Sequence, residues 1–152
     1  MMIVRSVGSW SAAGLLLIAL IGCGRSDLGT VSGTVTLDGE PLADAMVIFT
    51  PMTGGRPAAG RTDAQGKYEV IHDRSDKGAL FGEHVVEIST GDELANEDDT
   101  ITTIPEKVPA KYNIASDLRA TVESGANVFD FALTSEGEIV DSNQLEASGE
   151  EG

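Results

Sequence analysis

The only cysteine of the chain, Cys23, follows directly on an apolar block, and its thiol is the clearest candidate for covalent chemistry. Residues 11–22 read SAAGLLLIALIG, and Arg5 is the only charged residue before Arg25. A cationic start followed by an apolar stretch of this kind is typical of a secretory signal. The block is too short to span a bilayer comfortably, which takes about 20 apolar residues. A single cysteine also excludes an intrachain disulfide and a zinc site built from several cysteines.

The residues Leu20, Ile21, Gly22 and Cys23 resemble the lipobox of bacterial lipoproteins, in which an aliphatic, a variable and a small residue precede the modified cysteine. The resemblance implies that the Cys23 thiol receives a diacylglycerol, that the bond before Cys23 is cut, and that the new amino terminus is acylated. The implied partner is a membrane, bound through this covalent lipid anchor, and no other cofactor is expected. Gly24 stands where an aspartate would favour inner-membrane retention, so the outer membrane of a cell envelope is favoured. The alternative is a stray cysteine in a simple secretory signal or a membrane anchor.

Two histidines are the only general bases of the usual kind in the sequence. His72 precedes Asp73 in a polar turn, and His84 lies on the inward face of an alternating stretch. Nucleophilic catalysis requires a nucleophile, a base and a group that orients the base, and an adjacent His-Asp pair supplies only part of that set. We therefore expect His84 to be a core residue and the protein not to be an enzyme. A cryptic hydrolase that uses His72 is the least favoured alternative.

The sequence has 25 acidic residues against 10 basic ones and a formal net charge of −15. This balance argues against a nucleic-acid partner, which requires clustered Lys and Arg, and against a basic patch for anionic lipid. One acidic segment offers the oxygen ligands that calcium prefers: Asp92, Glu93, Glu97, Asp98 and Asp99. Their spacing matches no EF-hand loop. We therefore expect a solvated insertion over residues 91–100, with weak calcium binding as the alternative and no other metal site.

Short stretches of alternating apolar and polar residues predict strands with one buried face. The dipeptide Asp38-Gly39 is a tight-turn signal between two of them, and no window predicts an amphipathic helix. We therefore predict an all-β fold of seven short strands. The inward positions are expected to be Val31, Gly33, Val35, Leu37, Val47, Phe49, Tyr68, His84, Val86, Ile88, Leu118, Ala120, Val122, Phe129, Phe131 and Leu133.

Three stretches resemble the carboxypeptidase regulatory-like domain, namely VSGTVTLDGEPLADAMVIFTP (31–51), RTDAQGKYEV (61–70) and GEHVVEI (82–88). The resemblance implies a single seven-stranded transthyretin-like (prealbumin-like) β-sandwich that serves as a structural or interaction module. His84 departs from the pattern by replacing the usual aromatic residue. The run VPAKYN (108–113) resembles a subgroup of small bacterial lipoproteins with this one domain. The matching positions are Gly33, Val35, Asp38, Gly39, Pro41, Leu42, Phe49, Thr62, Asp63, Gly66, Tyr68, Gly82 and Val86.

The expected organisation is a cleaved lipoprotein signal peptide (1–22), a tether (23–29), the sandwich (30–134) and a disordered acidic tail (135–152). The expected function is that of a non-enzymatic, lipid-anchored cell-envelope protein whose sandwich serves a structural role or binds a protein or glycan. The alternative is a carbohydrate- or calcium-assisted binding module, for which Tyr112 and Phe81 are the loop aromatics.

Overall fold

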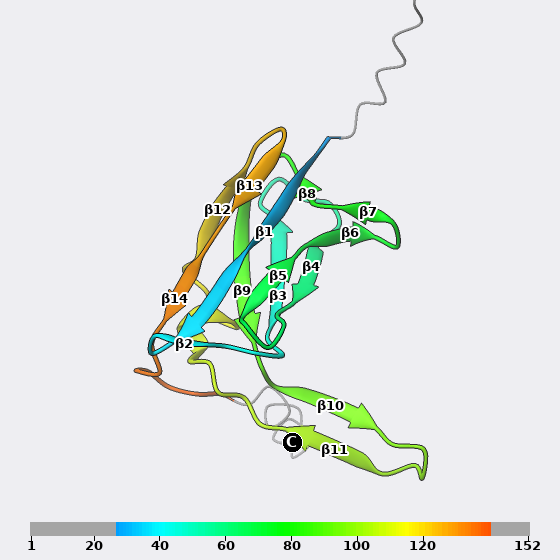
Figure 1. Ribbon diagram of the computed structural model, residues 1–152, viewed down its shortest axis with the longest axis vertical. Coiled ribbons are helices and arrows are strands. Elements are labelled where there is room, and N and C mark those ends of the chain that lie inside the picture. The colour runs from blue at the N-terminus through cyan, green and yellow to red at the C-terminus, as the bar shows by residue number, and fades with distance from the viewer. Residues whose placement is uncertain (1–26, 141–152) are drawn as a thin grey trace, which may run out of the picture.

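Strand β1 (Leu28–Leu37) is the longest strand among the described residues and forms the centre of the first of two sheets (Figure 1). The computed structural model describes residues 27–140. On one side β1 runs parallel to β13 (Ala126–Val128) and then to β14 (Phe131–Leu133). On its other side β1 pairs antiparallel with β2 (Glu40–Pro41), β5 (Lys67–Glu69) and β8 (Ala79–Leu80).

The turn between β1 and β2 is the one that the sequence predicts. Asp38 and Gly39 both have positive φ angles, of 51° and 83°. Two successive positive angles define the tight hairpin turn that Asp-Gly pairs favour, because glycine adopts this conformation at no steric cost. The chain therefore reverses sharply at the end of β1.

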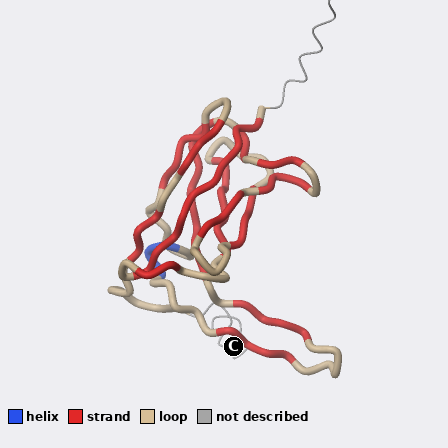
Figure 2. The backbone as a smooth tube through the Cα atoms, in the orientation of Figure 1, coloured by secondary structure: helices blue, strands red, loops and turns tan. Residues whose placement is uncertain are grey.

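The second sheet has the strand order β12-β9-β3-β4-β6-β7. Figure 2 shows in red how strands make up most of the described chain. The centre of the second sheet is the antiparallel pair of β3 (Met46–Pro51) and β9 (Gly82–Ser89), which are paired from Met46 opposite Ser89 to Pro51 opposite His84. The remaining members are β12 (Arg119–Val122), β4 (Ala58–Arg61), β6 (Ile71–Asp73) and β7 (Asp76–Lys77).

The core lies between the two sheets and is centred on Phe49 of β3. The Phe49 ring meets rings from both sheets, with centroid distances of 5.9 Å to His84 and to Phe129, 6.4 Å to Phe131 and 6.5 Å to Tyr68. The alternation in the sequence is confirmed, because every second residue of β3 and β9 is buried. Burial of this apolar face is the main stabilising contribution to such a fold.

The all-β sandwich is confirmed, but the predicted number of seven strands is wrong, because the described residues form fourteen. The number of strands is higher because several of them are short and interrupted. The partners of β1 on either side are short, and the ladder on one side is interrupted at Phe129 and Asp130, between β13 and β14. Gly33 of β1 lies opposite this interruption, and a Cβ atom at Gly33 would overlap the carbonyl oxygen of Phe129.

The acidic segment 91–100 is mostly exposed, as expected of a solvated insertion, but part of it forms a strand. Strand β10 (Asp92–Ala95) pairs antiparallel with β11 (Ile101–Ile104) and forms a two-stranded hairpin that projects from one end of the sandwich (Figure 1). The hairpin turn is closed by the Asn96 N–H, which donates to the Thr100 carbonyl at 2.8 Å. The β-branched residues of β11 favour an extended backbone, and they lie beyond the acidic stretch that dominates the local composition.

The first residues of the expected tail, 135–140, lie against the sandwich. The Ser135 N–H donates to the Asp38 carboxylate at 2.9 Å, and the Ala110 N–H donates to the Glu138 carbonyl at 2.7 Å. These two contacts tie the first part of the expected disordered tail to the sandwich, and residues 141–152 lie outside the described range. The one helix of the described part is the short 3₁₀ helix η1 (Ala110–Tyr112). Between residues 27 and 140, no helix is long and apolar enough to cross a membrane.

Candidate functional site

The lipobox residues Leu20, Ile21, Gly22 and Cys23 lie outside the described residues. The structure does show where the chain that follows them joins the sandwich. The carbonyl of Asp27 accepts a hydrogen bond from the Phe81 N–H at 2.9 Å, and the next two residues pair with β8. The amino-terminal end of β1 therefore defines one end of the molecule.

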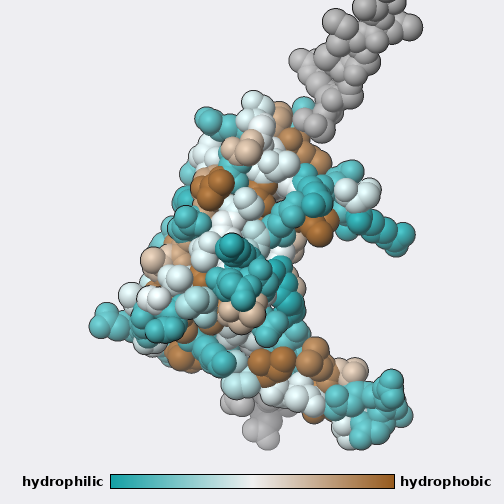
Figure 3. Space-filling model, in the orientation of Figure 1, coloured by the Kyte–Doolittle hydropathy of each residue, from teal (hydrophilic) through white to brown (hydrophobic). Residues whose placement is uncertain are grey.

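A groove of about 760 Å³ lies at the opposite end, between the hairpin and the chain that connects β2 to β3. Asp92, Leu94 and Ile104 lie on one face of the hairpin, because Asp92 is directly opposite Ile104 and Leu94 is two residues further along. This face forms one wall, and Figure 3 shows hydrophobic surface where the hairpin leaves the sandwich. The groove is lined by Pro41, Leu42, Ala43, Asp44, Arg61, Thr90, Asp92, Leu94, Ile104 and Lys107.

Arg61, at the end of β4, connects the hairpin to the sandwich across this groove. Its Nη1 donates to the Asp44 carbonyl at 3.0 Å, and its Nη2 donates to the Asp92 carboxylate, also at 3.0 Å. Both side chains of the ion pair are partly exposed, so solvent screens their attraction. The guanidinium therefore acts mainly by fixing the position of the hairpin relative to the chain at Asp44.

Glu106 holds the base of the hairpin from the other side. Its Oε1 accepts hydrogen bonds from the N–H and hydroxyl of Thr90 and from the N–H groups of Lys107 and Val108, each at 2.9 Å, while its Oε2 accepts one from the Gly91 N–H at 3.3 Å. One carboxylate thus ties the chain leading into β10 to the chain leaving β11. Backbone donors to a charged carboxylate form stronger hydrogen bonds than neutral pairs do.

The five calcium candidates do not converge in the structure. Asp92 is paired with Arg61, and Glu93 lies on the other face of the hairpin. Asp98 accepts hydrogen bonds from the N–H and hydroxyl of Thr100, which lower the pKa of Asp98. Glu97 and Asp99 are exposed in the turn. Across the described range, no group of three or more Asp, Glu, His or Cys side chains is placed to hold a metal ion.

Among the described residues, no hydrogen bond joins either histidine to a carboxylate. His84 is 1% exposed, its Nδ1 lies 3.0 Å from the Gly82 carbonyl, and burial lowers its pKa. This agrees with the expectation that His84 is a core residue. Asp73 does not orient His72, because its carboxylate accepts a hydrogen bond from the Arg74 N–H at 2.7 Å and lies 3.4 Å from Arg56.

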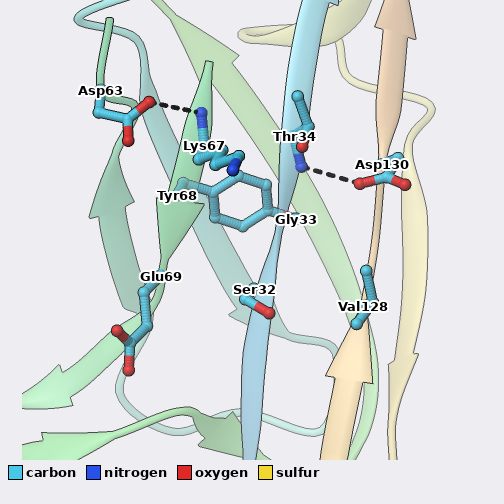
Figure 4. Close-up of a pocket in the computed structure, with 9 residues that line it drawn as sticks. All are labelled: Ser32, Gly33, Thr34, Asp63, Lys67, Tyr68, Glu69, Val128 and Asp130. Carbon is cyan, nitrogen blue, oxygen red and sulfur yellow. Dashed lines mark hydrogen bonds between the residues drawn. The ribbon is translucent and has the colours of Figure 1, made fainter. Parts of the chain in front are cut away.

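A second, more open hollow of about 610 Å³ lies over the junction of β1 and β5 (Figure 4). Two of its carboxylates and the Tyr68 hydroxyl are engaged within the fold. Asp63 Oδ1 accepts hydrogen bonds from the N–H groups of Gln65 and Lys67, and Asp130 accepts one from the Thr34 N–H, all at 2.9 Å. The Tyr68 ring points toward Gly33 (Figure 4), and its hydroxyl donates to the Phe129 carbonyl at 2.7 Å. Burial raises the pKa of Tyr68, so its hydroxyl stays protonated. The hollow is therefore bounded by groups that stabilise the fold.

The two loop aromatics lie at opposite ends of β1. Tyr112 is partly buried, its hydroxyl lies 3.3 Å from Thr134 Oγ1, and the Lys111 Nζ lies 5.0 Å from its ring centroid. Thr134 follows β14, which pairs with the carboxyl-terminal end of β1, whereas Phe81 contacts the residue that precedes β1. These rings therefore do not form one stacking platform for a sugar.

No protein-family model matches the chain, and no curated protein matches it. Among solved structures, the chain resembles the crystal structure of a 9R-lipoxygenase from Cyanothece PCC8801, with 16% sequence identity and a TM-score of 0.41. The match covers 71% of this chain but 16% of the lipoxygenase chain. This likeness is too small to carry any conclusion about the activity of the chain.

Proposed function

We propose that the chain is a non-enzymatic, lipid-anchored protein of the bacterial cell envelope, in which the sandwich holds the groove away from the membrane. Cys23 carries the lipid, and the outer membrane is the favoured location. The groove between the hairpin and the β2–β3 connection contacts a protein or glycan of the envelope. Net charge makes a nucleic-acid partner unfavourable.

The observation that carries this proposal is the placement of the two ends of the molecule. The chain from Cys23 joins the sandwich at the start of β1, while the groove contains Pro41 and Leu42, which follow the end of β1. Figure 1 shows the start of β1 and the hairpin at opposite extremes. A strand rises about 3.3 Å per residue, so β1 alone separates the two ends by roughly 33 Å. A tethered sandwich of this shape is suited to presenting its distal end.

The composition of the groove favours a binding role over a catalytic one. Leu42, Leu94 and Ile104 supply apolar surface, and Arg61, Asp44 and Lys107 supply polar groups around it. An apolar floor with a few polar groups at its rim is the usual make-up of a recognition site. The Arg61 guanidinium is already engaged by Asp44 and Asp92, so it orders the site and does not act on a substrate.

Site-specific photocrosslinking in the native envelope tests this assignment. A photoreactive amino acid at Leu94, inside the groove, should crosslink to one discrete partner. The same amino acid at Thr121, which is exposed on the edge strand β12, serves as the matched control. Equal crosslinking patterns from the two positions would remove the groove as the site of interaction. Cys23→Ser, which lacks the acceptor thiol, should release the protein from the membrane and abolish the Leu94 crosslink.

A further inference from the structure

The amino-terminal end of the sandwich exposes a group of apolar side chains beside the point where the chain joins β1. Met52 is 55% exposed and Phe81 is 40% exposed, and Leu80, the last residue of β8, is partly exposed. We call these three residues the amino-terminal patch. The Phe81 N–H donates to the Asp27 carbonyl at 2.9 Å, so the patch is fixed directly to the residue that precedes β1.

The loop of residues 51–57 is held against the same place. The Met52 N–H donates to the Glu83 carbonyl at 2.9 Å. A Cβ atom at Gly55 would lie 3.0 Å from Leu80 Cδ1, which shows how closely the loop packs on that side chain. The loop that carries Met52 therefore packs against the segment 80–83, which contains Phe81. Figure 3 shows hydrophobic surface next to the start of β1.

We propose that the amino-terminal patch contacts the lipid bilayer and inserts Phe81 and Met52 into its interfacial layer, an inference that rests on the proposed lipid anchor at Cys23. The length of chain between Cys23 and Asp27 limits how far the patch can lie from the membrane. Asp27 is the fourth residue after Cys23, and a fully extended chain spans at most about 3.5 Å per residue step, or roughly 14 Å over these four steps. The polar layer on each side of a bilayer is about 5–8 Å thick. A lipid on Cys23 therefore holds Asp27, and the patch bonded to it, at the membrane surface.

The charges near this end favour docking through apolar contact. Arg56 is paired with Asp73 at 3.4 Å, and Lys77 is paired with Glu69 at 2.9 Å. Because these two cations are paired with carboxylates, the proposed docking does not rely on them to bind anionic headgroups, and salt should not release the patch. Apolar side chains such as Phe and Leu on a protein surface can be buried at the boundary between headgroups and acyl chains. The contact would fix the orientation of β1 and direct the groove away from the bilayer.

Fluorescence quenching tests the proposal on protein made from residues 23–152. This chain has no tryptophan, because Trp10 is the only one in the sequence, so a single substitution provides a reporter. Phe81→Trp reports on the patch, and Ile101→Trp, at a position 64% exposed in β11, is the matched control. Met52→Trp is a second reporter at the patch. The Cys23 thiol is coupled to a maleimide phospholipid in phosphatidylcholine vesicles whose acyl chains are brominated near the headgroup.

The patch reporters should lose about half of their fluorescence, while the Ile101→Trp control keeps its own, because bromine quenches only at contact distance within the layer. The same result is expected in high salt. Unquenched Phe81→Trp and Met52→Trp, or equal quenching of Ile101→Trp, would overturn the proposal. Chemical coupling makes this outcome independent of whether cells acylate Cys23. An acylated Cys23 with unquenched reporters would remove the docking proposal alone, whereas an unmodified Cys23 would remove the anchor.

Discussion

The Nη2 of Arg61 lies 3.0 Å from the Oδ2 of Asp92, and this pair links the body of the sandwich to the projecting hairpin. Residue 61 ends strand β4, and residue 92 begins strand β10. The two partners come from distant parts of the chain, and the same guanidinium also binds the Asp44 carbonyl. The orientation of the hairpin, and with it the width of the groove, depends on this contact.

Asp92→Asn should loosen the hairpin without unfolding the protein. The free energy of unfolding should fall by at most about 1 kcal/mol, because the pair is partly exposed. Amide exchange within β10 and β11 should nevertheless accelerate, since those strands have no sheet partner besides each other within residues 27–140. The matched control is Glu69→Gln, which breaks the exposed Lys77–Glu69 pair and should leave the hairpin amides unchanged. Identical exchange in wild type and Asp92→Asn would contradict the positioning role of Arg61.

Glu106→Ala should destabilise the protein far more than a substitution at the exposed Glu93. The Glu106 carboxylate accepts hydrogen bonds from four backbone N–H groups and the Thr90 hydroxyl. Loss of these charge-assisted bonds is expected to cost about 2 kcal/mol. Glu93→Ala should stay within about 0.5 kcal/mol of wild type. Urea unfolding measures both variants, and equal midpoints would show that Glu106 does not hold the hairpin base.

Gly33→Ala should be the more damaging of two glycine substitutions. A methyl group at Gly33 would overlap the Phe129 carbonyl oxygen, which also accepts a hydrogen bond from the Tyr68 hydroxyl. Relief of that overlap requires β1 to separate from the segment between β13 and β14, at a cost of about 3 kcal/mol. Gly39→Ala meets no neighbouring atom within 4 Å, and it should cost only about 1 kcal/mol for its positive φ. Thermal denaturation measures both variants. A lower melting temperature for Gly39→Ala than for Gly33→Ala would refute the close approach of Gly33 to the Phe129 carbonyl.

His84→Phe should remove part of the loss of stability that occurs in acid. Burial places the pKa of His84 in the folded state below its value of about 6.5 in the unfolded chain. As the pH falls below that value, the unfolded chain takes up the proton first, so the free energy of unfolding declines. One such group contributes a slope of at most about 1.4 kcal/mol per pH unit. The difference between variant and wild type, measured by urea unfolding, should therefore grow as the pH falls below about 6.5. A difference that stayed constant with pH would contradict this account.

Calcium at about 5 mM should leave the melting temperature unchanged, because a calcium site needs six to eight oxygen ligands around one point. The carboxylates of Asp92, Glu93 and Asp98 point to separate partners or to separate faces of the hairpin. Differential scanning calorimetry with and without calcium checks this directly. A reproducible rise in melting temperature that Asp98→Asn abolished would instead assign calcium to the hairpin turn.

The strands of the core could be predicted because the alternation of apolar and polar residues lies within the sequence of each strand. Val31, Val35 and Ile88 each lie between two polar residues, and their side chains are fully buried. The hairpin could not be predicted in this way. Its first strand is acidic, and the groups that hold it, Arg61 and Glu106, lie outside its own strands. The groove likewise combines segments around residues 41–44, 61 and 90–107, which only the tertiary fold brings together.

The fragmentation of the sheets also escaped prediction, for a related reason. The sequence shows Phe129 and Phe131 as alternating inward residues of one strand. In the structure the ladder between β1 and this segment is interrupted at Phe129. The Phe129 N–H donates to the Ser32 carbonyl at 2.9 Å, but the Phe129 carbonyl accepts a hydrogen bond from the Tyr68 hydroxyl. A side-chain donor from another strand thus replaces a ladder hydrogen bond. The strand propensities of the residues do not predict that a distant side chain replaces a ladder hydrogen bond.

The most direct test of the central proposal is the mass of the amino-terminal peptide of the protein isolated from native membranes. We expect a peptide that begins at Cys23, carries a thioether-linked diacylglycerol, and has an acylated amino group. We also expect Cys23→Ser to yield no such species and to leave the membrane fraction. A soluble product that begins at another residue, or a membrane-bound one with a free Cys23 thiol, would contradict the lipid anchor.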